Sequence, residues 1–247
     1  MEIDFCDLAG CQSAAGTVVV IDVCRAFSTA ACAFGAGAER IYLTGEASEA
    51  IALGRRLSAD QPPGAPRVLV MGEVGGMPVE GFDLWNSPAQ VAGMDLRGHS
   101  LVQRTSAGTQ GVVQARKARR ILTASFNVAG ATARAILTAP PEPVTFVITG
   151  THPEDPRYGQ EDQACAEHIA ALLRGETPAP DLNRRWKADF LDVHRLMDLE
   201  EPLRSQFLAD IAICQQIDRF DFAMEVRLPS EQQPELYIME KKHPENR

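Results

Sequence analysis

Val68-Leu69-Val70-Met71-Gly72-Glu73-Val74-Gly75-Gly76 is the stretch from which the fold of this chain is best inferred. Its four apolar residues predict a buried strand, and the glycines behind them predict a loop at its carboxyl end. Proteins of the α/β class bind ligands at such strand ends, and glycine lets the backbone approach a ligand closely. Glu73, and Asp83 in the following Gly81-Phe82-Asp83-Leu84, offer the hard oxygen atoms that metal ions bind. A surface loop with solvated acids is the alternative that this stretch alone leaves open.

The composition is that of an ordinary globular protein. The chain has 247 residues, of which 45% are hydrophobic and 23% charged, with a formal net charge of −9. This charge argues against nucleic acid and anionic membranes as partners, because its field repels both. The longest apolar runs have strand length, too short to span a membrane, and the acidic N-terminus does not resemble a signal peptide. The 6 cysteines lack a Cys-x-x-Cys pair, which predicts free thiols and a cytoplasmic protein.

Short apolar runs alternate with alanine-rich stretches along the chain, which is typical of an α/β fold. We therefore predict one domain over residues 1–247, a three-layer α/β/α arrangement around a mixed sheet. Strands are expected at residues 18–22, 41–43, 68–71, 100–103, 118–123 and 144–149, with helices at 28–36, 48–57 and 128–137.

Two halves of this pattern echo each other at an offset of about eighty residues. Ala118–Thr123 repeats the pattern of Ala38–Leu43, and Gly150 stands where Gly72 stood. We predict two pseudo-repeated units, about 17–95 and 99–175, whose acidic loops face one another across a crevice. The alternative is that any regular strand–helix chain produces such echoes.

The remaining segment, 176–247, is expected to be an elaboration packed on this core, with a charged tail from residue 241 that frays. Helices are predicted within 185–197 and 203–217, and short strands at 222–228 and 236–239.

Asp22 ends the apolar run 18–21 and precedes Arg25, Ser28 and Thr29. A carboxylate at a strand end, next to an arginine and two hydroxyls, suits the joint binding of Mg²⁺ and phosphate. A helix N-terminal cap is the other common use of an aspartate at this place.

Two further segments are candidates for the same site. Arg104-Thr105-Ser106-Ala107-Gly108-Thr109 offers hydroxyls and backbone N–H groups at a helix start, a place that binds anions. Glu161 and Asp162 begin another helix, where acids usually complement the helix dipole at the surface. They become metal-ligand candidates only if they meet Glu73 and Asp83, because converging carboxylates need a cation between them.

The order of these motifs resembles that of the 2-phosphosulfolactate phosphatase family over nearly the whole chain. The segments that carry the resemblance are residues 21–29, 72–76, 80–88, 104–109, 124–127, 161–166 and 216–221, and the Gly-Phe-Asp-x-x-Asn-Ser-Pro block at 81–88 is the most distinctive.

The resemblance implies an α/β enzyme of the cytoplasm that uses Mg²⁺ to hydrolyse a phosphate monoester to sulfolactate and phosphate. The partner is then a small phosphorylated, sulfonated acid, and a homo-oligomer is left open. Carried over by matched position, the acids for metal binding and catalysis are Asp22, Glu73, Asp83, Glu161 and Asp162, with Arg25 beside them; the anion-binding residues are Ser28, Thr29, Arg104, Thr105, Ser106, Gly108 and Thr109.

The chain departs from the family's usual pattern at three positions. Val74 replaces an arginine, Arg104 opens a run that usually begins with threonine, and Ala107 replaces an asparagine. Losing one charge-assisted hydrogen bond to an anion changes binding by roughly 1.5–3 kcal/mol. Two alternatives therefore stand beside the first reading: a phosphatase for a different small phosphorylated acid, and an anion-binding protein without turnover. Whether Asp22 or a metal-bound water attacks phosphorus is also open.

Overall fold

The architecture is that of a computed structural model, which describes residues 1–152, 154–230 and 236–243. Its strands are β1 (Ile3–Asp7), β2 (Gly16–Ile21), β3 (Arg40–Leu43), β4 (Leu69–Gly72), β5 (Leu84–Trp85), β6 (Ser100–Arg104), β7 (Ala118–Ala124), β8 (Val144–Ile148), β9 (Ala223–Arg227) and β10 (Tyr237–Lys242). Its α-helices are α1 (Ala26–Gly35), α2 (Ala47–Ala59), α3 (Pro88–Ala92), α4 (Gly108–Gln114), α5 (Ala129–Leu137), α6 (Gln160–Arg174), α7 (Lys187–Val193) and α8 (Leu203–Cys214). Short 3₁₀ helices are η1 (Gly10–Ser13), η2 (Phe126–Val128) and η3 (Leu196–Asp198).

All ten of these strands form one mixed sheet in the order β1-β8-β2-β7-β9-β10-β3-β6-β4-β5. Neighbours are parallel in two blocks, β1-β8-β2-β7 and β3-β6-β4-β5. The antiparallel pairs β7-β9, β9-β10 and β10-β3 join the blocks. The predicted α/β class with a mixed sheet is confirmed.

Each block contains a strand from the other half of the chain. β2 lies between β7 and β8, and β6 lies between β3 and β4. The first strand of each proposed unit is therefore inserted between the second and third strands of the other unit. Duplication as the origin of this arrangement stays a prediction.

The segment 176–247, expected as an elaboration packed on the core, contributes strands to the sheet itself. Its strands β9 and β10 occupy the middle of the sheet, and its helix α8 packs against α3. The expectation of a frayed tail from residue 241 is wrong for its first two residues, because Lys241 and Lys242 pair with Met224 and Ala223. Residues 244–247 lie outside the described residues.

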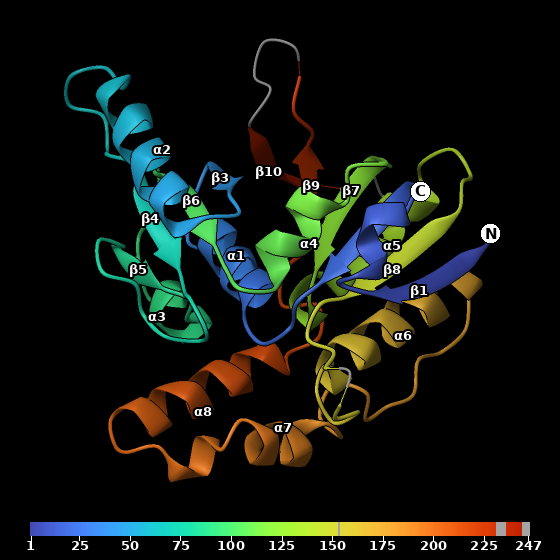
Figure 1. Ribbon diagram of the computed structural model, residues 1–247. Coiled ribbons are helices and arrows are strands. Elements are labelled where there is room, and N and C mark those ends of the chain that lie inside the picture. Colours follow the sequence, from blue (N-terminus) through green and yellow to red (C-terminus); the bar gives the residue numbers. More distant parts are fainter. Residues whose placement is uncertain (153, 231–235, 244–247) are drawn as a thin grey trace.

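Helices pack against the sheet along its whole width. In Figure 1, α1 and α4 lie in the middle, α2 lies at the outer side of the β3-β6-β4 block, and α5 and α6 accompany the other block. The helices α7 and α8 run across the bottom of the view, where α7 contacts α6. In the part of the chain that is described, no helix combines the length and apolarity needed to cross a membrane.

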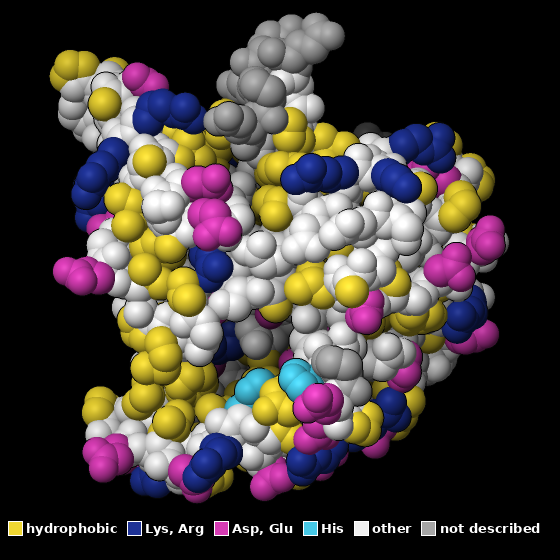
Figure 2. Space-filling model, in the orientation of Figure 1, with side chains coloured by type: hydrophobic (Ala, Val, Ile, Leu, Met, Phe, Trp, Pro, Cys, Tyr) yellow, Lys and Arg dark blue, Asp and Glu magenta, His cyan; other side chains and the backbone are white. Residues whose placement is uncertain are grey.

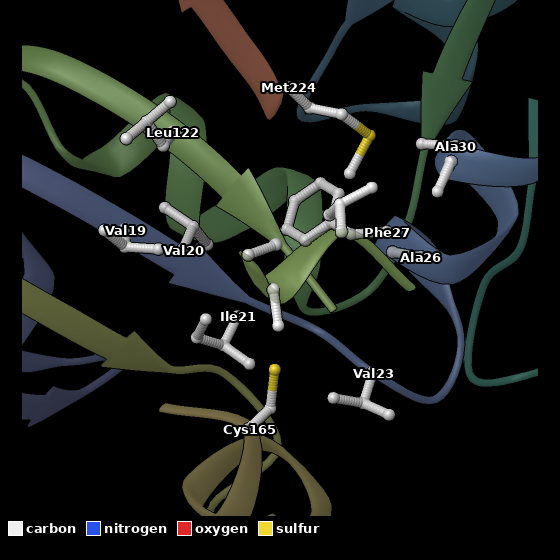
Figure 3. Packing of buried hydrophobic residues seen from close by; sticks show 14 of the residues in the cluster. Val19, Val20, Ile21, Val23, Ala26, Phe27, Ala30, Leu122, Cys165 and Met224 are labelled. Carbon is white, nitrogen blue, oxygen red and sulfur yellow. The ribbon is translucent and has the colours of Figure 1, made fainter. Parts of the chain in front are cut away.

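The strand β2 forms the centre of the core. All six of its residues are buried, as expected for a parallel strand with helices on both faces. Figure 3 shows Phe27 of α1 close to Met224 of β9, and Cys165 of α6 directed at Ile21. The strand end that carries Asp22 is thus fixed by packing on both sides.

Candidate active site

The site is organised around Asp22, the residue that follows β2. Its carboxylate accepts a hydrogen bond from the backbone N–H of Ala26 at 2.9 Å, at the start of α1. It also accepts one from the N–H of Gly108, at the start of α4. A Cβ atom at Gly108 would lie 2.8 Å from the Asp22 carboxylate, so only glycine allows this approach. One carboxylate oxygen of Asp22 thus accepts the first N–H group of α1, although Arg25 occupies the N-cap position, and its role in a site stays a prediction.

Asp162 fastens the first turn of α6 to the ends of two strands. Its carboxylate accepts hydrogen bonds from the N–H of Val23 at 2.7 Å and the N–H of Gly150 at 2.9 Å. The Thr149 hydroxyl donates to it at 3.3 Å. Asp162 is 2% exposed and its neighbour Glu161 is 4% exposed. This excludes the alternative that the two residues are solvated acids at the surface that only complement the helix dipole.

Glu161 is the least satisfied acid of the group. Its Oε2 atom is buried and has no hydrogen-bond partner among the described residues. A Cβ built on Gly150 would lie 3.4 Å from Oε1 and 3.2 Å from the Asp162 carboxylate, so the backbone after β8 passes close to both acids. A buried carboxylate oxygen without a partner is unfavourable, which makes it a candidate ligand.

Burial raises the pKa values of all three acids. Desolvation raises the pKa of Glu161 to about 8, and the charge of Asp22 adds to it. Desolvation raises the pKa of Asp22 to about 6, against the opposing hydrogen bond from Ala26. The pKa of Asp162 is raised by desolvation and by the charges of Glu161 and Asp22. These carboxylates are close enough to repel one another, so a bound cation would stabilise their ionised forms.

The donor chemistry of this cluster fits Mg²⁺. Among the described residues no three His, Cys, Asp or Glu side chains converge as a ready-made metal site. Magnesium, however, is typically held by one or two carboxylates, with substrate phosphate oxygens and water completing the shell. Asp22 and Glu161 supply that number, while the carboxylate of Asp162 is already engaged by three donors.

Glu73 connects the glycine loop after β4 to the loop before α4. Its Oε1 accepts the N–H of Ser106 at 2.5 Å, and its Oε2 accepts the N–H of Gly76 at 2.5 Å and the Ser106 hydroxyl at 3.1 Å. Its charge contributes to the raised pKa of Asp22. With these donors already bound, Glu73 holds the glycine loop against the start of α4, and its role as a metal ligand stays a prediction.

Asp83 does not join the acids, contrary to the sequence-based expectation. Its carboxylate accepts the N–H of Val70 at 2.8 Å and pairs with Arg67 at 2.7 Å. The side chain of Asp83 thus closes the turn before β5 at the level of Val70, whereas Glu73 follows the carboxyl end of β4. The Gly-x-Asp pattern in the sequence does not indicate at which end of β4 the Asp83 carboxylate lies.

Arg25 lies beside Asp22, as predicted, but its side chain is buried and already has partners within the protein. It is 6% exposed, pairs with Asp210 at 2.7 Å, and donates to the carbonyl of Gly76 at 3.3 Å. Its guanidinium carbon lies 4.3 Å from the ring centres of both Trp85 and Phe207. The charge of Arg25 lowers the pKa of Asp22, which shows that the two groups interact.

Four predicted anion-binding hydroxyls are used inside the protein. Ser28 donates to the carbonyl of Val23 at 2.8 Å, and Thr29 to the carbonyl of Arg25 at 2.9 Å. Thr105 and Thr109 exchange backbone and side-chain hydrogen bonds at the start of α4. All four residues are at most 1% exposed, so their hydroxyls shape the loops, and their contact with an anion stays a prediction.

The other residues of that segment line the loop surface. Ser106 is exposed, and its hydroxyl also accepts the N–H of Gly75 at 2.8 Å. Arg104 donates to the carbonyls of Gly45 at 3.1 Å and Glu73 at 2.9 Å. Arg104 is therefore anchored on backbone between β3 and β4, where it also holds the position of the glycine loop.

Asp210 is the residue of this region that sequence reasoning missed. It lies on α8, is 0% exposed, and forms the ion pair with Arg25. An acid on the same helical face as Phe207, Ile211 and Cys214 was a usable signal, because a charged residue among apolar positions is buried only when paired.

The acids do not lie in the larger of two prominent cavities. A cavity of about 940 Å³ lies between α2, α4 and the β9–β10 segment, lined by Thr44, Glu49, Gln110 and Tyr237 among others. The charged groups of its rim are exposed, so we assign the chemistry to the buried cluster instead. Figure 2 shows the front face hollowed above α7 and α8, with basic side chains inside the hollow and histidine side chains on its lower edge.

Comparisons with known proteins agree on one family. The model of a family described as 2-phosphosulpholactate phosphatase matches residues 7–228. A probable 2-phosphosulfolactate phosphatase of Bacillus subtilis (strain 168) is 32% identical over 215 residues, which is 86% of this chain and 88% of the relative. Another, of Synechocystis sp., is 30% identical over 222 residues, or 85% and 88% of the two chains. One from Carboxydothermus hydrogenoformans is 36% identical over 156 residues, or 63% and 60%.

Proposed function

The chain belongs to the 2-phosphosulpholactate phosphatase family, and on that basis we propose that it hydrolyses 2-phosphosulfolactate to sulfolactate and phosphate with the help of Mg²⁺. The protein is accordingly a phosphoric monoester hydrolase. The observation that carries the proposal is the buried cluster of Asp22, Glu161 and Asp162 beside Arg25, at the carboxyl ends of the neighbouring strands β2 and β8.

Each side chain has a role that follows from its contacts. Asp22 is held by the N–H groups that begin α1 and α4, so its carboxylate is fixed in position. Arg25 provides positive charge for the phosphoryl oxygens, which carry the developing charge. Asp162 keeps α6 attached to both strand ends, and Glu73 keeps the glycine loop closed. Mg²⁺ held by Asp22 and Glu161 would polarise the phosphoryl group and neutralise its charge.

Two routes for the attack on phosphorus remain, and trapping a covalent intermediate separates them. Asp22 either attacks phosphorus itself or removes a proton from the attacking water. When Asp22 attacks phosphorus, its carboxylate displaces the alkoxide of the ester and forms an acyl phosphate that water then hydrolyses, whereas direct attack by water forms no covalent intermediate. A phosphoaspartate trapped at low pH is therefore the deciding observation for the first route, and its absence throughout turnover supports the second.

A different small phosphorylated acid is the second candidate substrate. Val74 is 46% exposed on the glycine loop, at a place where the family usually has an arginine. Arg104 does not replace that charge at the loop tip, because it is anchored on the carbonyls of Gly45 and Glu73. An anionic group of the substrate that the arginine would bind therefore lies next to the apolar side chain of Val74 in this protein.

Phosphate release from a panel of small phosphate esters tests the proposal. We expect turnover of 2-phosphosulfolactate, loss of that turnover with a chelator, and its return with Mg²⁺. Asp22→Asn should abolish release, and Asp95→Asn, whose carboxylate pairs with Arg97 at the surface, should not. Faster turnover of a phosphorylated acid without a sulfonate favours the second candidate. If the protein binds inorganic phosphate but hydrolyses none of the esters, it is an anion-binding protein without phosphatase activity.

The proposal places the enzyme in the cytoplasm. All six cysteines are free thiols in the structure, which suits a reducing compartment. Whether it acts as a homo-oligomer stays a prediction.

A further inference from the structure

We infer that Asp210 is a positioning residue of this site, which orients the Arg25 guanidinium so that its free edge is presented to the phosphoryl oxyanion. The inference rests on the proposed function, because it assigns Arg25 to the bound phosphate. It brings α8, a helix of the C-terminal segment, into the working of a site built by the N-terminal strands.

The plane of the guanidinium is fixed by two aromatic rings. Its central carbon lies 4.3 Å from the ring centre of Trp85 in β5 and 4.3 Å from that of Phe207 in α8. The two rings themselves meet edge to face, with centroids 5.2 Å apart. Such contacts attract a cation and limit its tilt. They leave the rotation of the guanidinium within its own plane undetermined.

Asp210 sets this rotation. Its Oδ2 accepts Nη1 of Arg25 at 2.7 Å, while Nη2 reaches the carbonyl of Gly76 at 3.3 Å. The position of Asp210 is itself determined by its Oδ1, which accepts the Ser87 hydroxyl at 2.6 Å and the N–H of Ala89 at 3.1 Å. The carboxylate is 0% exposed, so it has no freedom to follow a moving arginine.

The fork of Arg25 keeps donors for a ligand. A guanidinium has five N–H donors, and the bonds within the described residues use one on Nη1 and one on Nη2. Nε donates no hydrogen bond within the described residues, so it is available to a ligand together with the remaining N–H groups. Binding a phosphate through two parallel N–H groups requires a defined orientation of the fork.

A purely structural ion pair is the competing explanation. Arg25 and Asp210 would then only attach α8 to the loop after β2, and substitution would lower stability without touching the ligand. The two explanations differ in whether Asp210 affects phosphate binding through Arg25. A double-mutant cycle measures that dependence.

The experiment measures binding of inorganic phosphate by titration calorimetry to the full chain with Mg²⁺ present. We compare wild type, Asp210→Asn, Arg25→Gln and the double variant, with Asp198→Asn as control, since Asp198 is exposed and pairs only with Arg195 in the described structure. Asp210→Asn should weaken binding roughly tenfold or more, as expected for losing an oriented charge-assisted contact. The double variant should bind no more weakly than Arg25→Gln, and the control should match wild type.

Unchanged binding in folded Asp210→Asn would overturn the inference, and so would additive losses in the double variant. Should Asp210→Asn fail to fold, Ser87→Ala decides, because it removes a donor that fixes Asp210 while the ion pair remains. We expect Ser87→Ala to weaken phosphate binding severalfold, and wild-type binding would contradict us. The wild type could also bind phosphate, with the variants behaving as predicted, and yet turn over no ester. That result would contradict the proposed function but would still support the positioning role of Asp210.

Discussion

Replacing Glu161 by glutamine should stabilise the metal-free protein by an amount that grows with pH. Burial raises the pKa of Glu161 from 4.5 to about 8. Below pH 4.5 both the folded and the unfolded chain hold the proton, so Glu161 contributes nothing to the pH dependence. Between pH 4.5 and 8 the unfolded chain releases the proton and the folded chain retains it, so the free energy of unfolding falls as the pH rises. Above pH 8 this loss is complete.

The size of the effect follows from the same shift. One pKa unit corresponds to about 1.36 kcal/mol, so a rise from 4.5 to about 8 corresponds to on the order of 5 kcal/mol. Glu161→Gln removes this loss and keeps the shape, since the amide places a donor where the protonated carboxyl has its hydroxyl. At about 2–4 °C per kcal/mol in a chain of this length, the metal-free variant should melt roughly 10–20 °C higher than wild type at pH 8. At pH 4 the two should melt together.

Thermal unfolding between pH 4 and 8, with a chelator and then with Mg²⁺, tests this expectation. Mg²⁺ should raise the melting temperature of wild type and raise that of Glu161→Gln much less, because the variant lacks one proposed ligand. Asp95→Asn serves as the control for a lost surface carboxylate. Equal melting of variant and wild type at pH 8, or a variant that is less stable there, would show that Glu161 is not the buried acid described above.

Three further substitutions separate the roles within the site. Asp22→Asn should reduce phosphate release by at least about 10³-fold, as for the loss of a catalytic group, with an unchanged circular dichroism spectrum; near-wild-type turnover would remove Asp22 from the mechanism. Gly108→Ala puts a methyl group 2.8 Å from the Asp22 carboxylate and should lower kcat more than tenfold, whereas a fully active variant would place the carboxylate elsewhere. Asp83→Asn breaks the ion pair with Arg67. The free energy of unfolding in urea should fall by roughly 1 kcal/mol, and kcat should stay within about twofold of wild type. A large fall in kcat would show that Asp83 belongs to the active site.

The sequence predicted the main elements because their patterns are local. The helix expected at 48–57 is α2 (Ala47–Ala59), and the strand expected at 144–149 is β8 (Val144–Ile148). In both, the apolar periodicity agrees with the tertiary burial. The edge strand β1 (Ile3–Asp7) was not predicted, because acids interrupt it and its pairing with β8 lies outside the local sequence.

The order of the strands in the sheet could not be predicted from local sequence patterns. The insertion of β2 between β7 and β8 joins residues more than a hundred positions apart, and no periodicity encodes it. The central place of β9 and β10 was missed for the same reason.

The fold brings some of the predicted site residues together, and the other candidates are engaged elsewhere for a common reason. Asp22, Glu161 and Asp162 interact as expected for acids at strand ends, with Arg25 beside Asp22. Hydroxyls such as Ser28 were assigned to an anion by residue type, although a buried hydroxyl is equally well satisfied by a backbone carbonyl. Residue type shows what a side chain can bind, but the competing partner next to it in space decides what it does bind.

A crystal of this protein soaked with Mn²⁺ and inorganic phosphate, measured at the manganese absorption edge, locates the ion and its ligands in one map. We expect a single anomalous peak coordinated by the carboxylates of Asp22 and Glu161, with a phosphate oxygen on the ion and Arg25 donating to the same phosphate. A peak held by other side chains, for example in the cavity between α2 and α4, or phosphate bound away from Arg25, would contradict the assignment of this site.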